Sequence, residues 1–221
     1  MVDKAPEPGR TKTRLAPALS LEQAADLYRG FLQDTLHMAL GLRGERVTLV
    51  YPRRSGTRRA LAALVPAGVL LQPPPGTGLG AALVGAVDRH FGLGFNRVVL
   101  IGSNNPTLPA DIVQEACRLL DDHDLVIGPS TDGGYYPIGM TAPHPGVFEG
   151  IAWSTDVVYS QTFERARELG LSVASAPEWY DVDTMADLRR LQQELAGLPP
   201  DVAPATCSRL ALSVSAAANP S

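Results

Sequence analysis

A basic loop opens the chain. In KAPEPGRTKTRLAP, Lys4, Arg10, Lys12 and Arg14 fall within eleven residues, around a Pro-Gly turn at Gly9. The backbone N–H groups of a glycine-containing turn, together with long cationic side chains, suit the oxygens of a phosphate group. The alternative is a surface loop whose cations are merely solvated.

Three carboxylates could supply complementary chemistry. Asp181 and Asp183 alternate in YDVDT, so on an extended segment both side chains point to one side, and Asp132 lies in STDGGYYPIG. Two carboxylates aimed at one point suit a hard cation such as Mg²⁺ that also takes substrate phosphates. The alternatives are structural: Asp183 and Thr184 could cap a helix, and Asp132 could form a turn through its own side chain.

The stretch VVLIGSNNPTLPADI, residues 98–112, has the form of an active-site loop that lacks charge. A β-branched strand stops at a glycine, a polar loop follows, and Pro109 can begin a helix. The loop tip carries Asn104 and Asn105 and no carboxylate. An amide oxygen can coordinate Mg²⁺ but brings no negative charge, so a cation here would be held less tightly.

A glycine-rich turn, PPPGTGLGAAL, precedes another helix. Gly76, Gly78 and Ala81 fit GxGxxA, but that dinucleotide-binding pattern belongs directly after a first strand, with an acid about 20 positions further on. The strand VVLIG ends without an acid, so a nicotinamide dehydrogenase is disfavoured. The glycines of this turn, Gly78 and Gly80 among them, either let a nucleotide approach the backbone or permit a tight turn.

Alternating strands and helices must position these loops. Hydrophobic patterns predict helices at 21–40, 57–65, within 73–92, at 109–122, 154–169 and 184–195, and strands at 47–51, 68–72, 98–102, 124–128, 135–140 and 171–176. This order favours an α/β fold with a mainly parallel sheet and helices on both faces. Pro137 should interrupt its strand or place it at an edge. Ligands of such sheets bind beyond the carboxyl ends of the strands, where the polar loops meet.

The two ends of the sequence depart from this pattern. MVDKAPEPGR offers almost no strand before the first loop, so we expect a truncated first strand or a sheet that begins unusually. Residues 1–197 should form a single domain. Residues 198–221 are rich in Pro, Ala and Ser and are expected to be a poorly ordered tail.

Composition narrows the class of protein. The chain has 221 residues and a net charge of −4, yet residues 1–60 hold 11 Lys/Arg against 6 Asp/Glu. A pI near 5.5 argues against nucleic-acid binding, and the basic segment instead fits a phosphate-bearing small molecule. Two isolated cysteines, with neither a signal-peptide core nor an apolar run long enough to span a bilayer, lead us to expect a cytoplasmic protein.

Several of these motifs occur together in the order of a known family. The basic loop, the GLG helix start, IGSNNPTLP, GPSTDGGYYPIG, WST and DVDTMADL span residues 4–190, about six-sevenths of the chain. In this combination the sequence resembles the bacterial glycosyltransferase-like family labelled selenodomain-associated transferase. That family is similar to the GT-A-fold nucleotide-diphospho-sugar transferases, and to the guanylyltransferases that activate phospholactate or phosphoenolpyruvate in deazaflavin-cofactor synthesis.

The resemblance implies a three-layer α/β/α sandwich of GT-A type and a role for each motif. The four cations of the basic loop would hold the phosphates of the donor, with the glycines of both loops beside them. Asp183, with Asp181, would lie near a Mg²⁺ or Mn²⁺ ion, and Asp132 would act on the acceptor side. Asn104 stands where the family usually has aspartate, the expected first metal ligand, so the metal site would be weakened.

Three functions follow from this resemblance. The leading one is metal-assisted glycosyl transfer from a nucleotide-diphospho-sugar to a small acceptor. The close alternative is a nucleotidylyltransferase that uses an NTP and a phosphorylated small molecule, and releases pyrophosphate. The third is a nucleotide-binding protein with weak or no catalysis, because Asn104 replaces the expected aspartate. The donor base, the acceptor and the oligomeric state are open at this point.

Overall fold

The computed structural model describes residues 1–16, 18–42, 46–54, 56–74 and 76–218. The helices are α1 (Leu21–Leu40), α2 (Thr57–Ala62), α3 (Leu79–Gly92), α4 (Ala110–Leu119), α5 (Val158–Glu168), α6 (Met185–Gly197) and α7 (Pro204–Ala218), with short 3-10 turns η1 (Thr13–Leu15) and η2 (Pro145–Phe148). The strands are β1 (Thr48–Val50), β2 (Leu70–Gln72), β3 (Val98–Ile101), β4 (Leu125–Pro129), β5 (Tyr135–Met140) and β6 (Val173–Ser175). No helix within these ranges is both long enough and apolar enough to cross a membrane.

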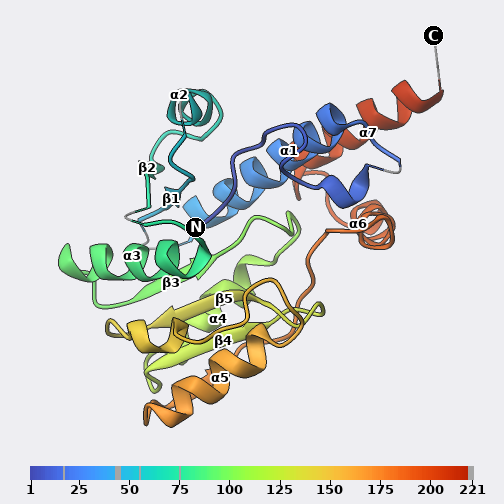
Figure 1. Ribbon diagram of the computed structural model, residues 1–221. Coiled ribbons are helices and arrows are strands. Elements are labelled where there is room, and N and C mark those ends of the chain that lie inside the picture. Colours follow the sequence, from blue (N-terminus) through green and yellow to red (C-terminus); the bar gives the residue numbers. More distant parts are fainter. Residues whose placement is uncertain (17, 43–45, 55, 75, 219–221) are drawn as a thin grey trace.

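The strands form an α/β arrangement with one reversed member (Figure 1). β3, β5, β4 and β6 are neighbours in that order, and β1 pairs with β2 in parallel. β4 and β6 are parallel, whereas β5 runs antiparallel to both β3 and β4. Among the described residues, Met1 to Asp3 contribute no full strand, only an isolated parallel bridge between Val2 and Val50 of β1, so the sheet begins unusually. The first basic loop therefore leaves the sheet from beside β1.

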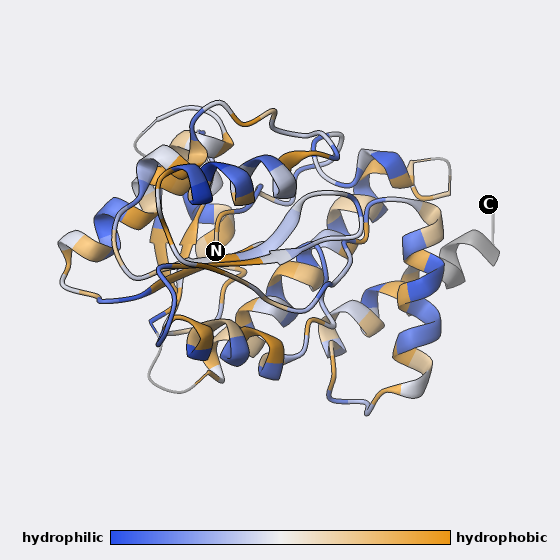
Figure 2. Ribbon diagram, turned by 90° about the horizontal axis from the view of Figure 1, so that it is seen from below, coloured by the Kyte–Doolittle hydropathy of each residue, from blue (hydrophilic) through white to orange (hydrophobic). Residues whose placement is uncertain are grey.

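Helices cover both faces of the sheet (Figure 2), and alternation along β4 shows why. Successive side chains of a strand point to opposite faces. Leu125 and Ile127 are fully buried in the core shared with α3 and α5, whereas Val126 is buried against α4. The three-layer α/β/α fold predicted from the sequence is confirmed, since helices lie on both faces of the sheet that contains β4.

Pro137 neither lies on an edge strand nor interrupts its strand, contrary to both alternatives expected from the sequence. β5 is central, and Pro137 is the partner of Ile101 in β3. On its other side, the register between β4 and β5 shifts between Ile127 and Pro129, which leaves Gly128 opposite the proline. A Cβ on Gly128 would lie 2.5 Å from Pro137 Cδ, so a glycine at this position leaves the room that the proline ring needs.

Residues 198–221 were expected to form a poorly ordered tail, and this is wrong for α7, which packs along α1 (Figure 1). Residues 219–221 of the expected tail lie outside the described ranges. The carboxylate of Asp34, on α1, accepts hydrogen bonds from the backbone N–H groups of Ala205 (3.0 Å) and Thr206 (2.7 Å). Gly30 allows the close approach, because a Cβ there would lie 3.0 Å from the Ala205 carbonyl oxygen. A long-range cap of this kind leaves no signal in local composition.

Replacing Asp34 with alanine should therefore destabilise the protein. The change removes the N-terminal cap of α7 and leaves two N–H groups without acceptors, at a cost of about 2 kcal/mol. We expect Tm to fall by about 4–8 °C in thermal unfolding. Asp88→Ala, an exposed acid on α3, is the matched control and should leave Tm within about 1 °C. Equal Tm values for both variants would contradict this account of α7.

Candidate active site

A cleft of about 700 Å³ opens at the carboxyl ends of the strands. Its walls come from the loops after Met1–Asp3, β1, β2 and β3, from β5, and from residues 179–183 before α6. A cavity of this size falls in the range typical of small-molecule sites. Among the residues proposed from the sequence, those that line it are Lys4, Lys12, Gly78, Asn104, Asp181 and Asp183.

Lys12 is held rigidly at the base of this cleft. Its side chain is 3% exposed, and its backbone has φ 51° and ψ 35°, a left-handed conformation that non-glycine residues rarely adopt. The ammonium Nζ donates to Asn104 Oδ1 and to Asp183 Oδ1, both at 2.8 Å. It also lies 5.6 Å from the ring centroids of Tyr28 and Phe31. Two charge-assisted hydrogen bonds and two aromatic faces thus fix this cation.

Asn104 joins Lys12 to the second carboxylate. Its amide Nδ2 donates to Asp181 Oδ2 at 3.0 Å. Burial raises the pKa of Asp181 to about 6, although the hydrogen bond from Asn104 and the charge of Lys12 oppose the rise. Burial also disfavours ionisation of Asp183, but the attraction of Lys12 outweighs it and lowers the pKa of that carboxyl. The network therefore contains one carboxyl group with a lowered pKa, Asp183, and one with a raised pKa, Asp181.

The loop after β3 is tied to the segment that carries these acids. Asn105 Nδ2 donates to the Tyr180 carbonyl at 2.7 Å, and the Val182 N–H donates to the Asn104 carbonyl at 3.1 Å. The amide oxygen of Asn105 accepts from the backbone N–H and the hydroxyl of Thr107, which shapes the loop. Both amides at the loop tip line the cleft, but the side chain of Asn105 is engaged in bonds that shape the loop, whereas the side chain of Asn104 bonds Lys12 and Asp181.

The cap of α6 falls on Thr184 and leaves Asp183 available to the cleft. The Thr184 hydroxyl accepts from the Asp187 N–H, and the Asp187 side chain accepts from the Thr184 N–H at 2.7 Å. This reciprocal capping box satisfies the start of the helix. The structural alternative raised from the sequence therefore applies to Thr184, while the carboxylate of Asp183 binds Lys12.

The rest of the basic loop is placed unevenly. Lys4 lines the cleft, whereas Gly9, Arg10 and Arg14 are exposed and lie outside its lining. Arg10 forms an ion pair with Glu7 at 3.5 Å, with its side chain 60% exposed. The positive charge of Arg14 helps to lower the pKa of Asp183, so Arg14 lies within electrostatic reach of the site.

The two glycines proposed beside the phosphates have different environments. Gly78 has φ +86°, precedes the first residue of α3 and lines the cleft. Gly80 lies outside the lining and packs on Trp153, since a Cβ on it would lie 3.1 Å from the indole Nε1. Gly80 thus allows the WST segment to pack against α3. The next residue after Trp153, Ser154, has φ +67° and lines the cleft.

Asp132 lies on an exposed turn at the margin of the site. Its Oδ1 accepts from the Gly134 N–H at 3.0 Å, the turn chemistry considered as the structural alternative. It is not in the cleft lining, but its charge contributes to raising the pKa of Asp181. The expected helix from residue 154 begins only at Val158, because the chain turns sharply at Ser154.

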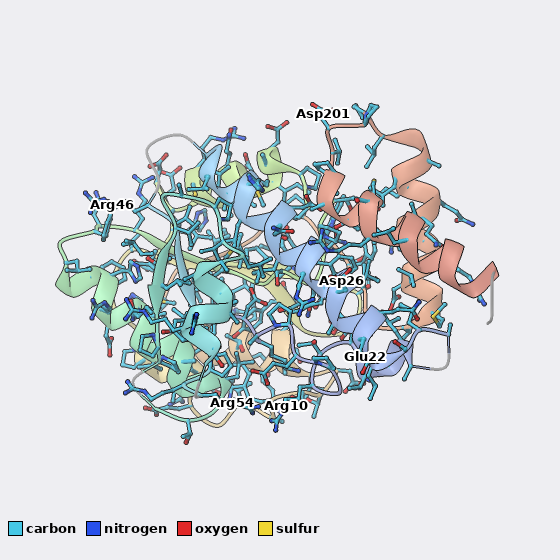
Figure 3. The ribbon with its side chains drawn as sticks, turned by 90° about the horizontal axis from the view of Figure 1, so that it is seen from above. Arg10, Glu22, Asp26, Arg46, Arg54 and Asp201 are labelled. Carbon is cyan, nitrogen blue, oxygen red and sulfur yellow. The ribbon has the colours of Figure 1, made fainter. Side chains whose placement is uncertain are left out.

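Sequence reasoning missed two cleft residues, Arg53 and Arg54. Both lie in the loop after β1, beyond Tyr51 and Pro52, and line the cleft. Arg54 donates to Glu7 Oε2 at 3.3 Å, and the same oxygen forms the ion pair with Arg10. Glu7 therefore links Arg10 and Arg54, which are labelled near one another in Figure 3. A pair of arginines in the loop after a predicted strand, on the rim where the loops meet, was the available signal.

The donor set fits one divalent cation at the two aspartates only. The hydrogen bonds within the described residues engage Asp181 Oδ2 and Asp183 Oδ1, and leave the other oxygen of each carboxylate open. The amide oxygen of Asn104 accepts from the Lys12 ammonium at 2.8 Å, and a metal ion on the same oxygen would lie against that positive charge, so Asn104 does not fit as a ligand in this arrangement. Two carboxylate oxygens together with the phosphates of a substrate are a typical Mg²⁺ environment.

Comparison with known sequences points to one family. A family model described as "Uncharacterized protein conserved in bacteria (DUF2064)" matches residues 35–155. Over 141 residues the chain is 36% identical to a 3-phospho-D-glycerate guanylyltransferase from Phenylobacterium zucineum (strain HLK1). That match covers 62% of this chain, and the chain spans 62% of the length of that relative.

Solved structures extend the similarity over nearly the whole chain. A candidate nucleotide-diphospho-sugar transferase from Desulfovibrio desulfuricans G20 has 34% sequence identity and a TM-score of 0.86, with 97% of this chain and 96% of that chain covered. A 4-diphosphocytidyl-2C-methyl-D-erythritol synthase from Anaerococcus prevotii DSM 20548 has a TM-score of 0.59 at 10% identity, with 88% and 94% covered. The second likeness shows a shared fold alone.

Proposed function

The chain belongs to the bacterial DUF2064 family, and from that premise we propose that it is a nucleotidylyltransferase. Its donor would be a nucleoside triphosphate and its acceptor a phosphorylated small molecule. The observation that carries the proposal is the charge arrangement of the cleft. The lining holds four basic side chains, Lys4, Lys12, Arg53 and Arg54, and three acidic ones, Asp3, Asp181 and Asp183.

This arrangement suits a polyphosphate better than an isolated phosphate. Lys4 and Lys12 come from the first loop, and Arg53 with Arg54 from the loop after β1, so the cations approach from two neighbouring strands. Arginine binds two phosphate oxygens at once, and a fixed lysine supplies a point charge. A triphosphate spread between the two loops would contact both kinds of group.

In the proposed reaction an oxygen of the acceptor's phosphate attacks the α-phosphorus of the triphosphate. A new P–O bond forms as the bond from the α-phosphorus to the oxygen bridging to the β-phosphorus breaks, and pyrophosphate leaves. Lys12 would hold the donor and stabilise the charge that develops on its oxygens, which is electrostatic catalysis. A Mg²⁺ or Mn²⁺ ion held by Asp181 and Asp183 would supply further neutralisation of phosphate charge.

Two further readings remain as candidates. Glycosyl transfer, the leading expectation from the sequence, is supported by the description of the Desulfovibrio relative. Nucleotidylyl transfer takes precedence here because a guanylyltransferase is 36% identical over 141 residues. A nucleotide-binding role without turnover is supported by the amide of Asn104 at a position where a metal ligand was expected.

Calorimetric titration separates these possibilities. We expect GTP to bind with Mg²⁺ present, and UTP, UDP-glucose and GDP-mannose to bind more weakly. Release of pyrophosphate from GTP with 3-phospho-D-glycerate, phospholactate or phosphoenolpyruvate would then demonstrate transfer. Tighter binding of a nucleotide-sugar than of any NTP would overturn the proposal in favour of glycosyl transfer. Binding of GTP without pyrophosphate release from any acceptor would favour the binding protein.

Arg53 provides a test of the second basic loop. Arg53→Ala should weaken binding of the triphosphate by about 3–10-fold, because an exposed cation near phosphate contributes roughly 1 kcal/mol. The matched control is Arg58→Ala, an exposed arginine of α2 outside the cleft lining, which should leave affinity unchanged. The same titration measures both variants. If the two variants lose affinity equally, Arg53 does not contact the donor.

A further inference from the structure

Asn104 makes two hydrogen bonds that a carboxylate could not make together. Its oxygen accepts from the ammonium of Lys12 at 2.8 Å, and its Nδ2 donates to Asp181 at 3.0 Å. A carboxylate has acceptor oxygens only. An aspartate at this position could accept from Lys12, but it would place a second negative group against Asp181, and a further cation would be required between them. The amide therefore closes the network without an added ion.

Lys12 has the features of a fixed cation and not those of a flexible arm. The ammonium is bonded to both Asn104 and Asp183 and lies over the rings of Tyr28 and Phe31. The side chain is 3% exposed, so few other rotamers are open to it. Its position between the loop after β3 and the segment before α6 is where a cation shared by residues 104 and 183 would lie.

We propose that the Lys12 ammonium is a built-in cation of this site, and that Asn104 is a positioning residue that binds Lys12 and Asp181 at once. Lys12 takes the place that a divalent ion would take if residue 104 were acidic. On this view Asn104 is matched to a site that is assembled before any metal binds, and is not a damaged metal ligand. The inference concerns the protein without nucleotide, so it rests on the proposed function only in assigning this cleft to phosphate-bearing ligands.

Charge balance supports the assignment. One lysine and two aspartates, all within one hydrogen-bonded network, leave a single negative charge when the three are ionised. Partly buried ions are stable only when they are paired and hydrogen-bonded. An acid at 104 would raise the excess to two negative charges at the same place. If Asn104 had only lost the role of a metal ligand, its amide would have no specific partners. Instead, both the oxygen and the nitrogen of this amide are hydrogen-bonded, to Lys12 and to Asp181.

Binding of Mn²⁺ measured by EPR in the absence of nucleotide tests the proposal. The variants are Asn104→Asp, Lys12→Met and the double variant, with Asn96→Asp as the control that adds a charge just before β3, at the opposite end of the sheet. We expect the double variant to bind Mn²⁺ at least 10-fold more tightly than the wild type. Asn104→Asp alone should gain less than the double, because Lys12 still fills the position, and Asn96→Asp should gain nothing.

Two results would overturn the inference. Equal Mn²⁺ affinity for Asn104→Asp and for the double variant would show that Lys12 does not occupy the cation's position. A gain for Asn96→Asp as large as the gain for Asn104→Asp would show that added negative charge alone, and not the position of residue 104, raises Mn²⁺ affinity. Thermal unfolding in EDTA adds a second measure, in which Asn104→Asp should lower Tm more than Asn96→Asp does. Because nucleotide is absent throughout, failure here is distinct from failure of the proposed transfer reaction.

Discussion

Replacing Lys12 with methionine is expected to weaken binding of the nucleotide by about 30–150-fold. The ammonium is held beneath the cleft by Asn104 and Asp183, where it would meet donor phosphates with little loss of side-chain freedom. Hydrogen bonds to charged groups contribute about 2–3 kcal/mol, which corresponds to this change in Kd. Methionine keeps most of the unbranched apolar stem of the side chain and lacks the terminal ammonium, so the charge and the hydrogen-bond donors are lost. Calorimetry with GTP and Mg²⁺ measures the effect.

Arg10→Ala is the control for this prediction, because Arg10 belongs to the same basic loop. Its side chain is 60% exposed and paired with Glu7, and it lies outside the cleft lining. We expect a change in affinity below about 3-fold, since exposed ion pairs contribute little. A uniform loss in both variants would indicate a general effect of positive charge and not a specific grip by Lys12. Lys12→Arg should also weaken nucleotide binding. The guanidinium is larger than the ammonium, and the Lys12 side chain is only 3% exposed, so the larger group has no room there.

Much of the fold follows from local pattern. Continuous apolar runs such as VVLIG and DLVIG became the buried strands β3 and β4, as expected of strands covered on both faces. The resemblance to GT-A-type transferases, and to guanylyltransferases, is confirmed by the matches to the Desulfovibrio and Phenylobacterium proteins. What local pattern could not supply was long-range compensation: Gly128 opposite Pro137, and Asp34 at the start of α7, are distant in sequence from the features they explain.

The outline of the candidate site could also be predicted from the sequence. Loops that follow parallel strands meet at one edge, so Lys12, Asn104 and Asp183 could be brought together from their positions in the sequence. Which atom of each residue meets which partner could not be predicted. The contrast between Lys12, buried in the network, and Arg10, exposed two residues earlier, depends on the left-handed backbone at Lys12, which no composition rule indicates.

Replacing Asp181 with asparagine is expected to stabilise the protein above pH 6 in the absence of metal. Burial raises the pKa of Asp181 to about 6, from an ordinary value of 3.8. The folded state thus binds this proton more tightly than the unfolded state, and stability falls as pH rises from about 4 to about 6. A shift of this size corresponds to ~3 kcal/mol. Asparagine carries no charge to desolvate, and its oxygen can still accept from Asn104, so Tm at pH 8 in EDTA should rise by several degrees.

The gain should vanish near pH 4, where the wild-type carboxyl is already protonated, and this dependence separates the charge from a packing effect. Asp183→Asn is the matched control with the opposite sign. Because the pKa of Asp183 is lowered by Lys12, its ionised form stabilises the fold at neutral pH, and the variant should lower Tm there. If both variants shift Tm in the same direction at pH 8, the electrostatic account fails. Asp181→Asn could stabilise the protein and also abolish metal-dependent nucleotide binding. The carboxylate would then lower stability while it supports binding, as expected of a functional residue and not of a structural one.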